Sequence, residues 1–255
     1  MAGNHGGHVH ALLVEVESPI HRLPAAVKIV AALLFVLAVV ATPREAFWAF
    51  AVYAVVLLGL MAAARVPLGL LVRRLAIEVP FVVFAVLMPI IAQGPRVEVL
   101  GVSLAVEGLW GAWNILVKAT LGLMTTLVLT ATTSMPGLLA GMDRLHVPRA
   151  FTGIAGFMVR YADVVAGDMR RMRIARISRA HDPRWIWQAR AVASSAGALF
   201  IRSYERGERI HAAMLARGYD GSLPRYGTPA APSQWLVGLA LPAFATVVCI
   251  VAWSR

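Results

Sequence analysis

The stretch WLVGLALPAFATVVCIVAW, residues 235–253, decides the class of protein to which this chain belongs. It contains no charged residue and is close to the length of about 20 mostly apolar residues that a bilayer-spanning helix needs. Trp235 and Trp253 stand at its two ends, and tryptophan side chains are enriched at membrane–water interfaces. The stretch therefore predicts a transmembrane helix.

The composition of the whole chain agrees with a membrane protein. Of its 255 residues, 59% are hydrophobic and 15% are charged, whereas a soluble domain is usually nearer half apolar and a quarter charged. Four more stretches are apolar enough to resemble spans, at about 25–41, 46–64, 75–92 and 109–130. We therefore expect an all-α integral membrane protein with about five transmembrane helices and a cytoplasmic helical arm. A single cysteine, Cys249, excludes a disulfide within the chain, and the start MAGNHGGHVH does not predict a cleaved signal peptide.

Basic residues are distributed unevenly, and this predicts the orientation in the membrane. Fifteen arginines and seven acidic residues lie between Ser134 and Pro232, which places +8 of the total net charge of +11 in this region. The other side of the membrane would carry Arg44, Arg96 and Arg255. Because Lys and Arg are retained in the cytoplasm, we expect the N-terminus and the basic region inside and the C-terminus outside.

The sequence predicts four parts along the chain. They are a cytoplasmic N-terminal segment (1–24), four transmembrane helices (25–133), a cytoplasmic and partly membrane-embedded helical arm (134–232) and a last transmembrane helix (233–255). Prolines and glycines divide the arm into a short helix at about 137–147 and two long helices at about 149–179 and 185–217. Each long helix ends on an arginine, Arg179 or Arg217.

The second long helix carries a stripe of arginines. At about 100° per residue Arg202, Arg206, Arg209 and Arg217 share one face. Three interpretations are open: a solvated basic face, adhesion to anionic lipid headgroups, and a docking element for a soluble protein. The small residues Ala216 and Gly218 on both sides of Arg217 favour the docking element, because they leave the guanidinium group free to enter a groove on a partner.

The sequence of this helix end resembles a known family. MLARGYDG (214–221) is similar to the second Ala-Arg-Gly signature of the T components of energy-coupling factor (ECF) transporters, the CbiQ/EcfT family, especially the CbiQ type of cobalt importers. Ser178-Arg179-Ala180 resembles a degenerate first copy. SPIHRLPAAVKIV (18–30), TATTSMPGLLAGMDRLHVPRAF (130–151) and RYADVVAGDMRRMR (160–173) agree with the same family, so the resemblance covers nearly the whole chain.

The resemblance implies a coupling subunit of an importer in a bacterial cytoplasmic membrane. In this family two long cytoplasmic coupling helices place their signatures in grooves of two ATP-binding-cassette (ABC) ATPases, here CbiO-like, which bind ATP and Mg²⁺. A CbiM-like substrate-binding membrane subunit, alone or with a CbiN-like one, completes the transporter. By this analogy the ATPase contacts are Ser178, Arg179, Ala180, Ala216, Arg217 and Gly218, supported by Arg202, Arg206 and Arg209. Cobalt is the expected substrate, and nickel or a vitamin stays open.

The chain itself is not expected to be an enzyme or to bind a cofactor. It contains no G-x-x-x-x-G-K-[ST] loop, so ATP hydrolysis would belong to the partner. An intramembrane enzyme would have to use residues that no catalytic motif organises: His21, Glu78, Lys118, Asp143 and His146. A basic anchor for nucleic acid is disfavoured because Trp185, Trp187 and Tyr204 do not form a stacking platform.

Three further groups have structural interpretations that we favour. His5, His8 and His10 could form a weak, open metal site, but flexible Gly-His tails are common without that role. Glu78 and Lys118 could form a polar relay within the membrane, but Glu78 is expected to pair with Arg74 one helical turn earlier. Lys118 is expected to reach the interface or to form a hydrogen bond between helices.

Overall fold

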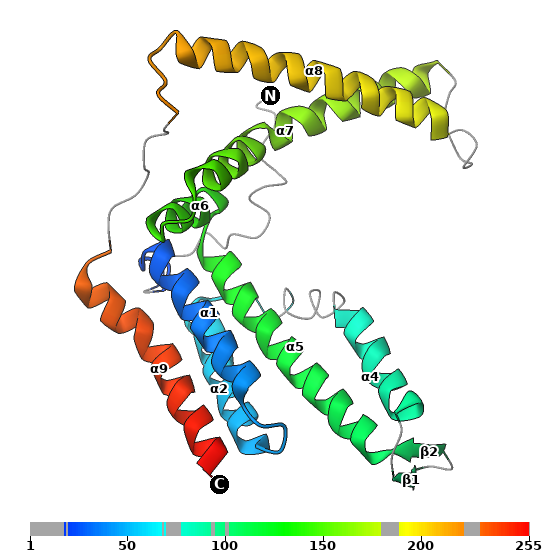
Figure 1. Ribbon diagram of the computed structural model, residues 1–255, viewed down its shortest axis with the longest axis vertical. Coiled ribbons are helices and arrows are strands. Elements are labelled where there is room, and N and C mark those ends of the chain that lie inside the picture. The colour runs from blue at the N-terminus through cyan, green and yellow to red at the C-terminus, as the bar shows by residue number, and fades with distance from the viewer. Residues whose placement is uncertain are drawn as a thin grey trace. The chain divides into compact units, whose positions relative to one another are not determined.

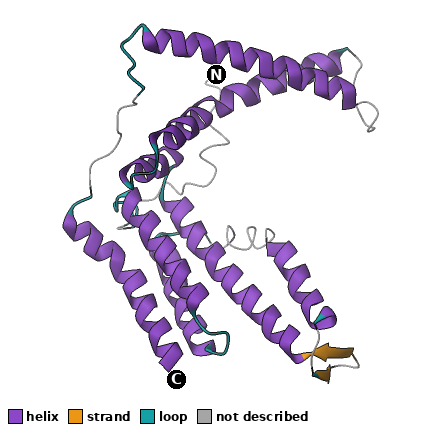
Figure 2. Ribbon diagram, in the orientation of Figure 1, coloured by secondary structure: helices purple, strands orange, loops and turns teal. Residues whose placement is uncertain are grey.

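The computed structural model describes residues 18, 20–67, 69, 78–92, 95–99, 102–179, 189–221 and 230–254. In these ranges the chain is helical apart from one short hairpin (Figures 1 and 2). The elements are α1 (Ala25–Ala41), α2 (Phe47–Ala63), α4 (Val79–Ile91), β1 (Arg96–Val99), β2 (Val102–Ala105), α5 (Val106–Thr132), α6 (Met135–Arg144), α7 (Arg149–Ser178), α8 (Ala189–Leu215) and α9 (Pro232–Ser254). They form two compact units: α7 and α8 make up the arm unit, and the other elements make up the bundle unit.

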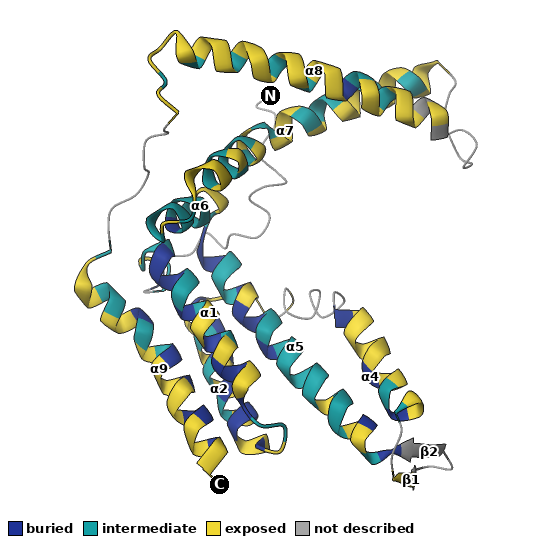
Figure 3. Cartoon of the chain, viewed as in Figure 1, coloured by how far each residue is buried: buried dark blue, intermediate teal, exposed yellow. Residues whose placement is uncertain are grey.

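The bundle unit is a set of apolar helices around one core. α1 packs against α5, α6 and α9, while α5 also contacts α2 and α4. Fully buried side chains such as Phe35, Tyr53 and Leu57 lie between these helices. Other large apolar side chains face outward, among them Val55 and Leu236 at 68% and 76% exposure (Figure 3). An apolar core together with an apolar exterior is the pattern of helices that have lipid as their solvent.

The helices lie at or near the predicted spans; of the span predicted at 75–92, α4 covers Val79–Ile91, and residues 75–77 lie outside the described residues. α5 and α9 are long and apolar enough to cross a bilayer by length and composition, and α1, α2 and α4 are shorter apolar helices. α1 begins and ends where the sequence predicts, and the bounds of α2, α5 and α9 differ from the prediction by a few residues. The fold class predicted from the apolar runs is confirmed.

Polar side chains inside the bundle unit form hydrogen bonds that join helices. The Tyr53 hydroxyl donates to the Ala245 carbonyl at 3.0 Å and lies 3.1 Å from Thr42 Oγ1. The Trp253 indole Nε1 donates to the Ala41 carbonyl at 2.9 Å. Because a polar group without a partner is costly in hydrocarbon, these bonds fix the turn between α1 and α2 against α9.

Charged residues of the predicted spans form hydrogen bonds with neighbouring helices, although Glu78 Oε1 is buried and has no partner among the described residues. Lys28 Nζ donates to the Thr132 carbonyl at 2.8 Å, which provides a partner for an end carbonyl of α5. Lys118 Nζ donates to the Val40 carbonyl at 2.7 Å, so the interpretation of Lys118 as a bond between helices is confirmed. The Glu78 carboxylate is buried and accepts from Thr120 Oγ1 at 3.0 Å. The partner expected for Glu78, Arg74, lies outside the described residues.

Two glycines allow helices of the bundle unit to approach closely. A Cβ added to Gly108 of α5 would lie 2.6 Å from the Met88 carbonyl oxygen of α4. A Cβ added to Gly141 of α6 would lie 2.9 Å from the Ala26 nitrogen of α1. Small residues at helix contacts are typical of membrane proteins, where packing replaces the hydrophobic effect.

The hairpin β1–β2 is the element that the sequence analysis did not predict. Its two strands pair antiparallel between α4 and α5, with Arg96 opposite Ala105 and Val99 opposite Val102. Strands of four residues are too short to give a periodic signal that stands out from the apolar runs on both sides. The chain is therefore an all-α membrane fold with one small β-hairpin.

Candidate functional site at the ends of α7 and α8

The end of α8 is a closed turn that presents Arg217. The amide of Tyr219 donates to the Met214 carbonyl and the amide of Gly218 donates to the Leu215 carbonyl, both at 3.0 Å. This pair of bonds is the Schellman motif, which requires a left-handed residue directly after the helix. Gly218 provides it, with φ +82°. The glycine of the Ala-Arg-Gly signature is thus needed for backbone geometry, and Arg217 occupies the capping position.

The surroundings of Arg217 are open. Ala216, Arg217 and Gly218 are all exposed, and a Cβ placed on Gly218 would meet no heavy atom within 4 Å. Among the described residues, no hydrogen bond or ion pair engages the Arg217 side chain. A guanidinium group in this position can offer its planar set of donors to a carboxylate of another molecule.

The end of α7 presents Arg179 in a different backbone geometry. Arg179 caps the helix with φ −90° and ψ 21°, and its amide donates to the Arg176 carbonyl at 3.1 Å. Ser178 Oγ donates to the Ile174 carbonyl of the preceding turn at 3.0 Å. Both Ser178 and Arg179 are exposed, and Ala180 lies outside the described residues. The first predicted signature is therefore also an exposed arginine at a helix end.

The two helices of the arm unit run antiparallel, so their ends point in opposite directions (Figure 1). Arg176 of α7 bonds Ser195 near the start of α8, whereas Asp168 of α7 bonds Arg206 farther along α8. α8 contains 27 residues, and at 1.5 Å per residue it is about 40 Å long. Arg179 and Arg217 are therefore carried at opposite ends of one helix pair.

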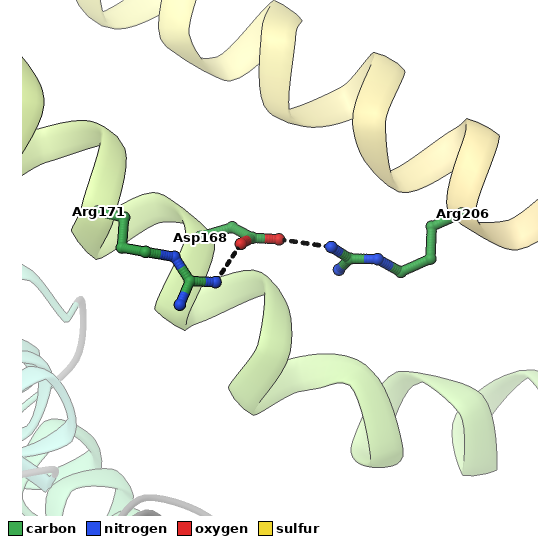
Figure 4. A network of polar contacts seen from close by, with 3 residues as sticks. All are labelled: Asp168, Arg171 and Arg206. Carbon is green, nitrogen blue, oxygen red and sulfur yellow. Dashed lines mark hydrogen bonds and ion pairs between the residues drawn. The ribbon is translucent and has the colours of Figure 1, made fainter.

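A cluster of three charged residues connects the helices (Figure 4). Asp168 Oδ2 accepts from Arg206 Nη2 of α8 at 3.0 Å, and Asp168 Oδ1 accepts from Arg171 Nη2 on its own helix. The hydrogen bonds from Arg171 and then Arg206 lower the pKa of the Asp168 carboxyl below its ordinary value. The carboxylate is therefore ionised throughout the neutral range. Sequence analysis did not identify Asp168 as a site residue, although it is an acidic residue two positions before the basic run Arg170–Arg173.

The predicted arginine stripe of α8 has more than one role in the structure. Arg202 and Arg209 are exposed, and Arg209 Nη1 lies 3.8 Å from the Glu205 carboxylate one turn earlier. Arg206 instead turns toward α7 and its side chain is 33% exposed. The stripe is thus not uniformly available to a partner, because Arg206 is engaged within the arm unit.

Apolar side chains remain exposed on both arm helices. On α7 Phe151, Ile154 and Met158 are each at least 60% exposed and follow one another at spacings of three and four. On α8 Phe200 and Tyr204 are 71% and 60% exposed. Residues at such spacings share a helix face, so each helix offers an apolar surface as well as a charged end.

The other candidate residues lie apart from these helix ends. His5, His8 and His10 are outside the described residues. Within the part of the chain that the structure describes, no group of three or more His, Cys, Asp or Glu could hold a metal ion. His146, the second residue after α6, adopts φ 61°, and His21 Nδ1 lies 2.8 Å from Ser18 Oγ. In the described part of the chain, the hydrogen bonds of Glu78 and Lys118 join them to Thr120 and Val40 and not to either histidine.

Comparison with known proteins is consistent with this arrangement. The family model of the CbiQ cobalt transport protein matches residues 16–226. The chain is 28% identical over 188 residues to the cobalt transport protein CbiQ of Rhodobacter capsulatus, covering 72% of this chain and 74% of that protein. It is 29% identical over 109 residues to a putative fused cobalt transport protein CbiMQ of Methanocorpusculum labreanum, covering 43% of this chain and 18% of that protein. With its apolar helical bundle and the family match over most of its length, the chain is a membrane protein that belongs to the CbiQ family of cobalt transport proteins.

Proposed function

We propose that this chain is the T component of an ECF-type ABC importer for cobalt ions. In this role it transmits the ATP-driven movement of two ABC ATPase subunits to a substrate-binding membrane subunit. The observation that carries the proposal is the geometry of the arm unit, in which two long helices end, in opposite directions, in exposed arginines. Each arginine would anchor its helix in a groove of one ATPase through a paired carboxylate.

The closed end of α8 supports this role because it fixes the direction of the anchor. The Gly218 turn completes its backbone hydrogen bonds without involving the Arg217 side chain. The guanidinium group therefore stays available while the helix end stays ordered. A helix that adhered only to lipid headgroups would need neither the turn nor small residues beside the arginine.

The substrate-binding partner is proposed to be a CbiM-like membrane protein, alone or with a CbiN-like one. The name of the Methanocorpusculum labreanum relative joins CbiM and CbiQ in one chain, which supports such a neighbour. The exposed apolar faces of α7 and α8 offer a surface for a membrane-embedded partner. Cobalt is preferred over nickel or a vitamin because the matching family model and the named relatives are cobalt transport proteins. ATP and Mg²⁺ would bind to the ATPases, and this chain would bind no cofactor of its own.

The orientation follows from the same proposal. The arm carries most of the basic excess, so α7 and α8 and the N-terminus would lie in the cytoplasm of a bacterial cell, at the inner membrane, with the C-terminus outside. The ATPases are then on the side where ATP is present. Closure of the ATPase pair on ATP would pull on both anchors and so move the arm helices.

A paired substitution tests the proposal. Arg179→Glu together with Arg217→Glu should abolish co-purification of the ATPases and reduce labelled cobalt uptake to background, because both anchors would repel the partner carboxylates. The matched control is Arg160→Glu together with Arg170→Glu, which makes the same two charge changes at exposed arginines of α7 away from the helix ends. It should retain both activities. Robust cobalt uptake by the paired variant in membranes would refute the coupling role.

A further inference from the structure

Two polar contacts at separate positions join α7 and α8 among the described residues. Arg176 Nη1 of α7 donates to Ser195 Oγ of α8 at 3.1 Å, and Arg206 of α8 is paired with Asp168 of α7. Leu199 lies between these points on α8 and is the buried large apolar side chain of that helix among the described residues. Two points of attachment fix the angle between two rods, whereas one point would leave them free to rotate about it.

The ion pair is the attachment that resists rotation of the far end of α8. Without it, the polar contact that remains between the described residues of α7 and α8 is at Ser195, which is 22 residues or about 33 Å from Arg217 at 1.5 Å per residue. A rotation of about 10° over that length would displace Arg217 by about 6 Å. The donor–acceptor distance of a hydrogen bond varies by only about 0.5 Å. While Arg179 stays bound in its groove, such a displacement would therefore move Arg217 too far to form hydrogen bonds in the second groove.

The chemistry of the cluster allows the ion pair to be removed without leaving a buried charge alone. Asp168 is 14% exposed, and its second carboxylate oxygen accepts from Arg171 on the same helix (Figure 4). Loss of the Arg206 side chain would leave Asp168 paired with Arg171. An uncompensated buried charge would be strongly destabilising, so Arg171 makes Arg206 a position where substitution should change geometry more than folding.

We infer that Asp168 is a positioning residue of the arm unit: through its ion pair with Arg206 it fixes the angle between α7 and α8 and thereby the separation of Arg179 and Arg217. Its consequence for transport rests on the proposed function, whereas its consequence for geometry does not. If the separation of Arg179 and Arg217 matters for coupling, loss of the ion pair should lower the amount of cobalt transported per ATP hydrolysed.

The geometric part is tested on the full chain in lipid nanodiscs by distance measurement between two spin labels. The labels are placed at Ala175→Cys and Ala213→Cys, exposed positions one turn before the helix ends, in a background with Cys249→Ala. Arg206→Ala should broaden the narrow distance distribution of the parent protein. Glu205→Ala is the matched control, because its ion pair with Arg209 lies within α8 and joins no second helix; its distribution should stay narrow. An unchanged distribution in Arg206→Ala would overturn the inference.

The functional part uses the complex with its ATPases and the membrane partner. Arg206→Ala should lower cobalt transported per ATP hydrolysed at least several-fold while ATPase subunits still co-purify, and Glu205→Ala should leave that ratio unchanged. Arg206→Lys should restore part of the ratio, since it keeps the charge at that position. Asp168→Glu checks the same pair from the other side and should also retain part of it. A broadened distribution with an unchanged transport ratio would refute the positioning role. If the parent chain itself supports no ATP-driven uptake, the proposed function fails, and the label distances still decide the geometric inference.

Discussion

Gly218→Ala is the substitution for which the structure gives the clearest magnitude. The residue has φ +82°, and a Cβ there would meet no heavy atom within 4 Å, so the cost is conformational and not steric. Placing an L-residue in the left-handed region costs about 1–2 kcal/mol. An energy of that size changes a two-state ratio by a factor of about 5–30. The closed turn at the end of α8 should therefore open about 5–30 times more often.

Hydrogen exchange of the backbone amides measures this opening directly. The Tyr219 amide, which donates to Met214, should exchange about 5–30 times faster in Gly218→Ala when exchange follows the opening equilibrium. Gly207→Ala is the matched control, because Gly207 lies inside α8 with no heavy atom within 4 Å of an added Cβ. There alanine should stabilise the helix by up to about 1 kcal/mol. An unchanged Tyr219 exchange rate in Gly218→Ala, or faster exchange in both variants, would show that the turn does not depend on the left-handed glycine.

Three other expectations follow from contacts in the two units. Lys28→Met removes a hydrogen bond to a buried carbonyl and should lower the free energy of unfolding by about 1–3 kcal/mol, as measured by thermal unfolding in detergent. Gly108→Ala forces a Cβ against the α4 backbone and should cost about 1–3 kcal/mol in the same assay. The pKa of Asp168 is lowered by the facing guanidinium groups of Arg171 and Arg206, so its ion pairs stabilise the arm above the ordinary Asp pKa and are lost as the pH falls through the lowered one. The distribution of distances between the two spin labels should thus stay narrow from about pH 8 to pH 5 and broaden only below about pH 4, the ordinary range of an Asp carboxyl. Broadening near pH 6 would contradict the assignment to Asp168.

The helices could be predicted because their signals are local. α1 lies at the predicted residues 25–41, and α7 begins directly after Pro148 and ends beside Arg179, as the prolines and the basic run indicate. The end of α8 could also be predicted from the sequence. A glycine after a basic helix predicts a left-handed cap, and Gly218 adopts that conformation. In each case the residues that determine the structure are neighbours in the sequence.

Contacts between distant residues were not predictable in the same way. Asp168 and Arg206 are 38 positions apart, and helical periodicity placed Arg206 on a stripe facing a partner. That stripe is correct as a helix face, but periodicity on one helix carries no information about which part of the face another helix covers. The bond from Lys28 to the Thr132 carbonyl spans 104 positions, and the sequence does not predict it for the same reason. The missing information is the antiparallel pairing of α7 with α8 and the packing of α1 on α5.

The two ends of the arm unit differ in how far the chain itself determines the presentation of the arginine. At the end of α8, backbone hydrogen bonds close the turn around Gly218, so the position of Arg217 is set by the fold. At the end of α7, Arg179 has an ordinary negative φ, and the Ser178 hydroxyl bonds back to its own helix at Ile174. Ala180, the residue that corresponds to Gly218 in the first predicted signature, lies outside the described residues, so the glycine turn is described at the end of α8 alone. The ion pair of Asp168 then acts on both ends at once, because it relates the fixed end of α8 to the less constrained end of α7.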